Sequence, residues 1–148
     1  MKKLKDTLMS DDNQKQVIED SVNLINEQVA ALSGIGGVAV KTIFKMVKAI
    51  RSDVLEDLMT RLLPEFSEAL QPFADKFAKS GSNDFGAFLT ERKEEVVQAL
   101  LSITDIRAER AENKVLRNGY QKLRKSAESH VTNAIPGIAA VVGKFTGK

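Results

Sequence analysis

The residues best suited to binding chemistry lie between positions 105 and 110 of this 148-residue sequence. Asp105, Arg107, Glu109 and Arg110 alternate in charge within about two helical turns. A guanidinium group is planar, always charged and able to bind a carboxylate or phosphate through two hydrogen bonds. Two arginines one turn apart therefore make this segment the candidate ligand-binding site, for a small anion.

Two other interpretations of this segment stay open. Its carboxylates Asp105, Glu109 and Glu112 lie three or four positions apart, so they can form an ion-pair network with the arginines along one solvated helix that leaves the core. Alternatively, the arginines are buried and tie this helix to a carboxylate on a neighbouring one. The sequence alone does not choose among these structural roles and the anion site.

Metal, cofactor and nucleophile chemistry have little support. The chain has no cysteine, which excludes disulfides, thiolate metal sites and cysteine nucleophiles. His130 is the only histidine, so a metal cluster or a catalytic triad would have one imidazole at most. The adjacent carboxylates Glu19–Asp20 and Glu94–Glu95 fall on polar helix faces, where nothing tunes them for acid–base work. We therefore expect no enzyme activity, no cofactor and no metal site.

A glycine-rich run, Gly34-Ile35-Gly36-Gly37, precedes a helical pattern and so resembles a phosphate-binding loop. It follows a helix rather than a strand, however, and it lacks the Lys-Ser/Thr ending of such loops. An inter-helix turn is the better interpretation.

The elements that position these residues are all helical. Apolar residues recur at spacings of three and four and predict helices over about 12–32, 38–50 and 53–63, and a long one capped by Thr90. Pro64 and Pro72 are expected to kink a helix or start a new one, and another helix is expected to end at Pro136. No stretch alternates with a period of two, so no sheet is expected.

The two halves of the chain resemble each other. The pattern of Val40, Phe44 and Val47 lines up with that of Leu116, Tyr120 and Leu123. We predict a single all-α domain over 1–148, a bundle of about six to eight helices. Two diverged repeats, about 12–80 and 84–148, would be related by a pseudo-two-fold axis. The alignment places Arg107 and Arg110 opposite aliphatic residues of the first repeat.

Composition narrows the possible partners. The net charge is only +2 and aromatic residues make up 5%, so we expect no nucleic-acid partner. No run approaches the roughly 20 apolar residues that span a bilayer, and no signal peptide is recognisable. The lack of cysteine favours a reducing, cytoplasmic location.

A basic helix suggests a membrane surface as an alternative partner. Residues 34–51 carry Lys41, Lys45 and Lys48 with no acidic residue, opposite an apolar face. The segment 135–148 is similarly small, apolar and basic. Within a bundle, the apolar face would instead belong to the core and the lysines to its solvated edge, which is the interpretation we favour.

Three motifs resemble a family of small bacterial proteins known only as a domain of unknown function. They are Leu62-Leu63-Pro64-Glu65-Phe66, Asp84-Phe85-Gly86-Ala87-Phe88-Leu89, and Thr104-Asp105-x-Arg107-Ala108-Glu109-Arg110. The resemblance implies an all-helical, cytoplasmic protein and brings no activity, ligand or site residue with it.

The sequence therefore favours a non-catalytic interaction or scaffold domain. It would act on a protein partner through a helical groove, or by self-association. The alternatives are peripheral binding to anionic membranes and the anion site at residues 105–110.

Overall fold

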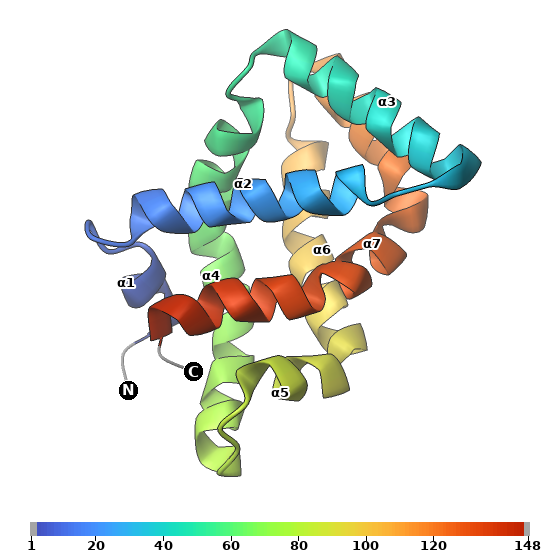
Figure 1. Cartoon of the computed structure of the whole chain (residues 1–148). Coiled ribbons are helices and arrows are strands. Elements are labelled where there is room, and N and C mark those ends of the chain that lie inside the picture. Colours follow the sequence, from blue (N-terminus) through green and yellow to red (C-terminus); the bar gives the residue numbers. More distant parts are fainter. Residues whose placement is uncertain (1–2, 147–148) are drawn as a thin grey trace.

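The computed structural model describes residues 3–146 and contains seven α-helices in that range (Figure 1). They are α1 (Leu4–Leu8), α2 (Gln14–Ala30), α3 (Gly34–Ile50), α4 (Val54–Ser80), α5 (Phe85–Glu91), α6 (Lys93–Glu109) and α7 (Lys114–Thr146). No strand occurs between residues 3 and 146, so the predicted all-α bundle of about six to eight helices is confirmed. The ends of the predicted domain, at 1–2 and 147–148, lie outside the described residues.

Three pairs of helical segments form the bundle (Figure 1). α4 and α6 run side by side, and α2 and the second half of α7 lie across them on one face. α3 packs against the first half of α7 at one end of the molecule. The predicted two-fold relation would also pair equivalent segments of the two halves, such as α3 with the first half of α7. The duplication itself stays a prediction.

A bend in α7 lets this one helix take part in two of the pairs (Figure 1). Pro136 lies inside α7. It has no N–H to donate, so the helix lacks one backbone hydrogen bond there. The prediction that a helix ends at Pro136 is wrong: Ile135 and Ala139 on either side are buried and anchor the helix across that position.

α4 likewise continues through both of its prolines. It runs unbroken over 27 residues with Pro64 and Pro72 inside it, so no new helix starts at either position. Each proline removes one backbone hydrogen bond. The buried side chains of Leu63, Leu70 and Phe73 anchor the helix on both sides of those missing bonds.

The turns between helices are shorter than predicted. Gly34, with a positive φ of 75°, begins α3, so the glycine-rich run forms the first turn of that helix rather than a loop. Thr90 lies inside α5 and does not cap a helix. The long helix α6 begins after Arg92, without a side-chain cap. The short helix α5 is capped by Asp84, whose Oδ1 accepts a hydrogen bond from the backbone N–H of Ala87 at 3.0 Å.

One connected apolar core extends from Leu4 to Val142. Aromatic rings of α4 and α5 pack together at one end of it. The ring of Phe77 lies 5.1 Å from that of Phe85 and 5.5 Å from that of Phe88, and Leu89 beside them is fully buried. This end of the bundle is well packed, in contrast to the region between α2 and the second half of α7.

Candidate functional site

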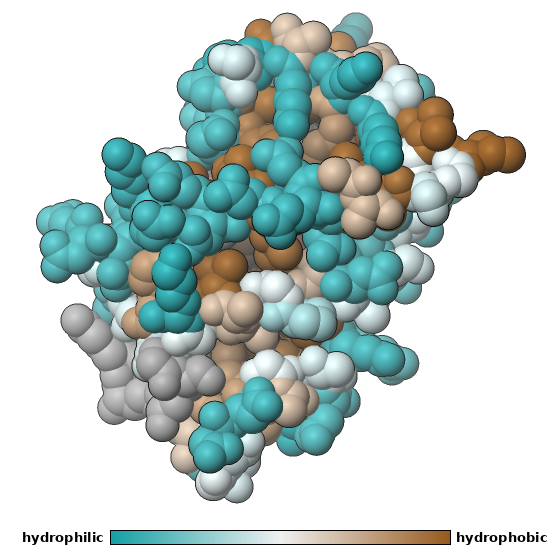
Figure 2. Space-filling view, in the orientation of Figure 1, coloured by the Kyte–Doolittle hydropathy of each residue, from teal (hydrophilic) through white to brown (hydrophobic). Residues whose placement is uncertain are grey.

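An apolar cavity of about 390 Å³ is the most prominent feature of the interior. It lies among α2, α4, α6 and α7, and α3 contributes at one end. Figure 2 shows the surface hollowed between α2 and the second half of α7, with apolar side chains at the floor. The lining is mainly aliphatic and includes Ile25, Leu63, Leu70, Leu101, Val131 and Ile138.

The cavity is elongated along α2. Val17 and Val29 both line it, and twelve residues of α-helix span about 18 Å. Leu8 of α1 lies toward one end, and Val40 and Phe44 of α3 lie toward the other. This shape is suited to a linear chain rather than to a compact ring system.

The polar groups of the lining are few and carry no fixed charge. Among residues 3–146, no lysine, arginine, aspartate or glutamate lines the cavity. Ser67 is only 1% exposed and donates its hydroxyl to the carbonyl of Leu63 at 2.8 Å. The Ser67 hydroxyl proton therefore already has an acceptor within α4 and needs none from a ligand. Gln28 of α2, with His130 and Asn133 of α7, adds further polar groups.

A close contact between α7 and α2 lies beside the cavity. A Cβ atom at Gly137 would overlap the end of the Leu24 side chain, so a larger residue there would push that side chain aside. Leu24 itself lines the cavity. Gly137 therefore leaves the space that Leu24 occupies at the edge of the opening.

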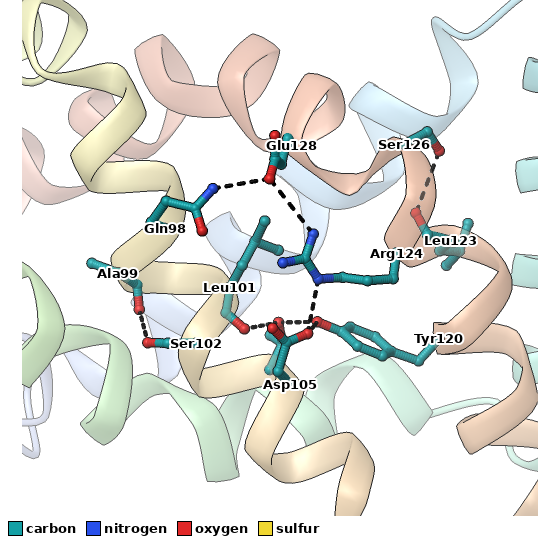
Figure 3. Close-up of polar contacts among 11 residues, drawn as sticks. Gln98, Ala99, Leu101, Ser102, Asp105, Tyr120, Leu123, Arg124, Ser126 and Glu128 are labelled. Atoms are coloured by element: carbon teal, nitrogen blue, oxygen red, sulfur yellow. Dashed lines mark hydrogen bonds and ion pairs between the residues drawn. The ribbon is translucent and has the colours of Figure 1, made fainter.

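A hydrogen-bonded network borders the cavity where α6 faces α7 (Figure 3). Tyr120 donates its hydroxyl to Asp105 Oδ1 at 2.6 Å, and Arg124 Nε donates to the same oxygen at 2.9 Å. The hydroxyls of Thr104 and Tyr120 lie 2.6 Å apart. Gln98 extends the network by donating to Glu128 at 2.9 Å. These contacts join α6 to α7.

The network changes the acidity of its members. Burial raises the pKa of Tyr120 to about 12, and the hydrogen bond to Asp105 adds to the increase. Burial also acts to raise the pKa of Asp105, but the hydrogen bonds from Tyr120 and Arg124 outweigh it and hold that pKa below its usual value. The ionised carboxylate and the neutral phenol thus stabilise each other.

The candidate residues of the 105–110 segment do not converge on one site. Asp105 points to α7, whereas Arg107 points to α4, where its Nη2 donates to Glu65 Oε1 at 2.5 Å and Nε donates to Oε2 at 3.3 Å. Glu109 and Arg110 are exposed at the end of α6. This geometry favours ion pairing between helices; the anion site stays a prediction.

Because the pair of Arg107 and Glu65 is solvated, we expect Arg107→Ala to lower the free energy of unfolding by less than about 1 kcal/mol. Their side chains are 43% and 38% exposed. Arg110→Ala should leave stability unchanged within error. Urea unfolding followed by circular dichroism measures both. A loss of several kcal/mol for Arg107→Ala would mean that the pair is buried in solution.

The predicted membrane-surface residues lie together on α3. Lys41, Lys45 and Lys48 are all exposed, and Lys48 donates to the side chain of Asn26 at 2.8 Å. The interpretation that the apolar face of α3 belongs to the core holds only for the side that packs against the bundle. Val40 is buried, but Met46 and Ile50, which the sequence assigned to the same apolar face, are exposed.

Sequence reasoning missed the cavity, since its size depends on the distances between helices. A weak signal was present: the stripe of large apolar residues on α4 is interrupted by the small, polar and buried Ser67. The partners of Asp105 were also missed. Tyr120 and Arg124 lie four residues apart, which places them on one face of α7.

Neither a metal site nor a membrane span is evident in the part of the chain that the structure describes. No three of its histidine and carboxylate side chains cluster closely enough to hold a metal ion. No helix within residues 3–146 is both long and apolar enough to cross a membrane. The cytoplasmic location and bacterial origin stay predictions.

Comparison with known proteins places the chain in a family. No curated protein and no solved structure matches it. Residues 4–146, nearly the whole chain and all three motifs noted in the sequence, match the Family of unknown function (DUF6918), and the protein therefore belongs to that family.

Proposed function

We propose that the protein binds an apolar ligand with a single linear chain, such as a fatty acid, in the cavity between α2 and α7. The observation that carries this proposal is the volume of about 390 Å³ with its aliphatic lining. Ligand pockets typically measure about 300–1,000 Å³ and are mostly apolar with a few polar groups. The role is one of binding, without catalysis.

The apolar lining of the cavity supports this proposal. The cavity opens at the surface between α2 and the second half of α7, so its aliphatic lining is accessible to water. A ligand that covers this lining removes apolar surface from water, which contributes roughly 25 cal/mol per Å². It also adds dispersion contacts that the lining otherwise lacks, and both effects stabilise the fold.

The size and polarity of the cavity define the class of ligand. An apolar cavity of about 150 Å³ holds one benzene molecule, so a cavity about 2.6 times larger holds roughly 15 carbon atoms. The lining lacks a charged partner for a buried head group. We therefore expect the chain to lie inside and the polar head to stay at the opening, near Gln28 and Asn133.

Thermal unfolding in the presence of saturated fatty acids from octanoate to stearate tests this proposal. The melting temperature should rise with chain length and level off near myristate or palmitate, where the cavity is full. At a ligand concentration of about 100 times Kd the stabilisation is about 2.7 kcal/mol, an increase of about 5–10 °C. No increase with any chain length would contradict the proposal.

A cavity-filling variant and its control locate the binding site. Ala134 lines the cavity on α7, so Ala134→Phe should remove at least most of the ligand-induced stabilisation while keeping or increasing the stability of the unliganded protein. Ala140, six residues further along α7, is exposed and does not line the cavity. Ala140→Phe should bind fatty acids normally. Equal binding by both variants would place the ligand elsewhere.

The interaction or scaffold role predicted from the sequence stays a prediction. Its support is the group of apolar side chains that α3 exposes, which is a separate feature from the cavity.

A further inference from the structure

The outer face of α3 is unusually apolar for an exposed helix surface. Ile35 is 92% exposed and Val38 is 62% exposed, and Met46 and Ile50 are exposed further along the helix. Figure 2 shows apolar side chains protruding where α3 begins. The opposite face of α3, with Val40 buried, packs onto α7 and the rest of the bundle. α3 is therefore apolar on two sides, only one of which the bundle covers.

Lysines flank the exposed apolar strip. At about 100° per residue, Lys41, Lys45 and Lys48 form a row between the buried side of α3 and the exposed apolar strip. Lysine side chains can lie along an apolar surface and still place their ammonium groups at its polar edge. The outer face of α3 thus combines insertable aliphatic groups with one row of positive charges.

Basic residues are concentrated on α3 and on the part of α7 that packs against it. Residues 34–50 and 114–125 contain eight basic residues and no acidic one. The remainder carries fourteen basic and twenty acidic residues, a net charge of −6. Arg124 of α7 is paired with Asp105, whereas Lys41 and Lys45 of α3 are exposed, so α3 itself presents the positive charge to solvent.

We propose that the outer face of α3 docks onto the surface of an anionic phospholipid membrane. Its exposed aliphatic side chains would enter the boundary between head groups and acyl chains, and its lysines would lie beside the lipid phosphates. A nucleic-acid interface would be mainly polar, which does not account for Ile35 and Val38 at the centre of the face. A second copy of this face would bring like charges together.

The docking face adjoins the proposed ligand cavity. Val40 and Phe44, on the inner side of α3, line that cavity. Docking would therefore bring a source of acyl chains next to it. The docking proposal rests on α3 alone and does not depend on the cavity, so the Ala134→Phe variant should bind vesicles like the unchanged protein.

Vesicle flotation at low ionic strength is the first test. We expect binding to vesicles of phosphatidylglycerol, none to vesicles of phosphatidylcholine, and release at high salt. Lys41→Glu combined with Lys45→Glu should weaken binding by about tenfold or more. Lys76→Glu combined with Lys79→Glu, at exposed positions near the end of α4, makes the same charge change and should leave binding intact or nearly so.

A single tryptophan reports insertion directly, because the chain has none of its own. The fluorescence of Ile35→Trp should shift to shorter wavelength with phosphatidylglycerol vesicles, whereas that of Ala78→Trp, at the far end of α4, should not. Ile35→Asp should weaken vesicle binding by about tenfold without loss of helical circular dichroism, since Ile35 packs against almost nothing.

Four results would overturn the docking proposal. The first is no vesicle binding, or equal binding to both lipids. The second is binding without a fluorescence shift at position 35, which would mean attraction by charge alone. The third is concentration-dependent self-association that Ile35→Asp abolishes, which assigns the face to a second copy. The fourth is binding to duplex DNA that is tighter than binding to phosphatidylglycerol.

Discussion

Leu89→Ala should lower the free energy of unfolding by about 4 kcal/mol, whereas Leu70→Ala should lower it by about 2 kcal/mol. Both side chains are buried, at 0% and 3% exposure. Leu89 follows Phe88 on α5 and has no exposed surface, so its removal forfeits contacts on every side. Leu70 lines the cavity and already lacks neighbours on one side. Urea unfolding followed by circular dichroism measures both values.

The comparison of these two leucines tests whether the cavity exists in solution. Thr90→Ala serves as a control on α5. Because Thr90 is exposed, this substitution should lower the free energy of unfolding much less than Leu89→Ala does. If Leu70→Ala costs as much as Leu89→Ala, the region around Leu70 is packed as tightly as the rest of the core. The proposed ligand site would then lose its physical basis.

Fatty acids should distinguish the two leucine variants further. Leu70→Ala enlarges the cavity, so we expect the chain length that stabilises best to increase in this variant. Leu89→Ala opens space away from the cavity lining and should leave the preferred chain length unchanged.

Tyr120 should ionise with a pKa of about 12 in the folded protein, compared with the ordinary value of 10.0. Because the pKa is raised in the folded state, Tyr120 stabilises the fold at every pH below 10. This contribution is lost as the pH rises from 10 to about 12. A difference of two pKa units corresponds to about 2–3 kcal/mol. Tyr120 is the only tyrosine, so ultraviolet absorbance of tyrosinate follows it without interference.

Two variants should shift this titration in opposite directions. Asp105→Asn removes the charge that opposes ionisation and should lower the pKa of Tyr120, which stays above 10 because burial is the larger cause. Thr104→Val removes a hydrogen bond that lowers the pKa and should therefore raise it. Circular dichroism on the same samples shows whether the fold persists. Ionisation near pH 10 in the folded protein would mean that Tyr120 is not buried in this network.

The two proposals are compatible with each other. In one, the cavity accommodates an acyl chain; in the other, the outer face of α3 docks onto a lipid surface. The fatty-acid measurements and the vesicle measurements use different variants, so either proposal can fail while the other stands.

The sequence by itself determined the secondary structure of the chain. Spacings of three and four residues in runs such as Ile18, Val22 and Ile25 produce helices because that period places the apolar side chains on one face. The all-helical class follows from such local patterns. The helix end expected at Pro136 and the new helices considered at Pro64 and Pro72 are absent for a non-local reason: burial of Leu63, Leu70 and Ile135 outweighs the hydrogen bonds that these prolines remove.

Only the tertiary structure decided where the candidate sites lie. The sequence identified Asp105 and Arg107 as unusual, but their partners Tyr120 and Glu65 come from other helices and depend on how those helices cross. The cavity is a property of helix spacing, which depends on the bend in α7 seen in Figure 1 and on how α7 and α2 approach each other near Gly137 and Leu24. Likewise, periodicity shows that α3 has an apolar face, but packing decides which of its apolar residues remain exposed.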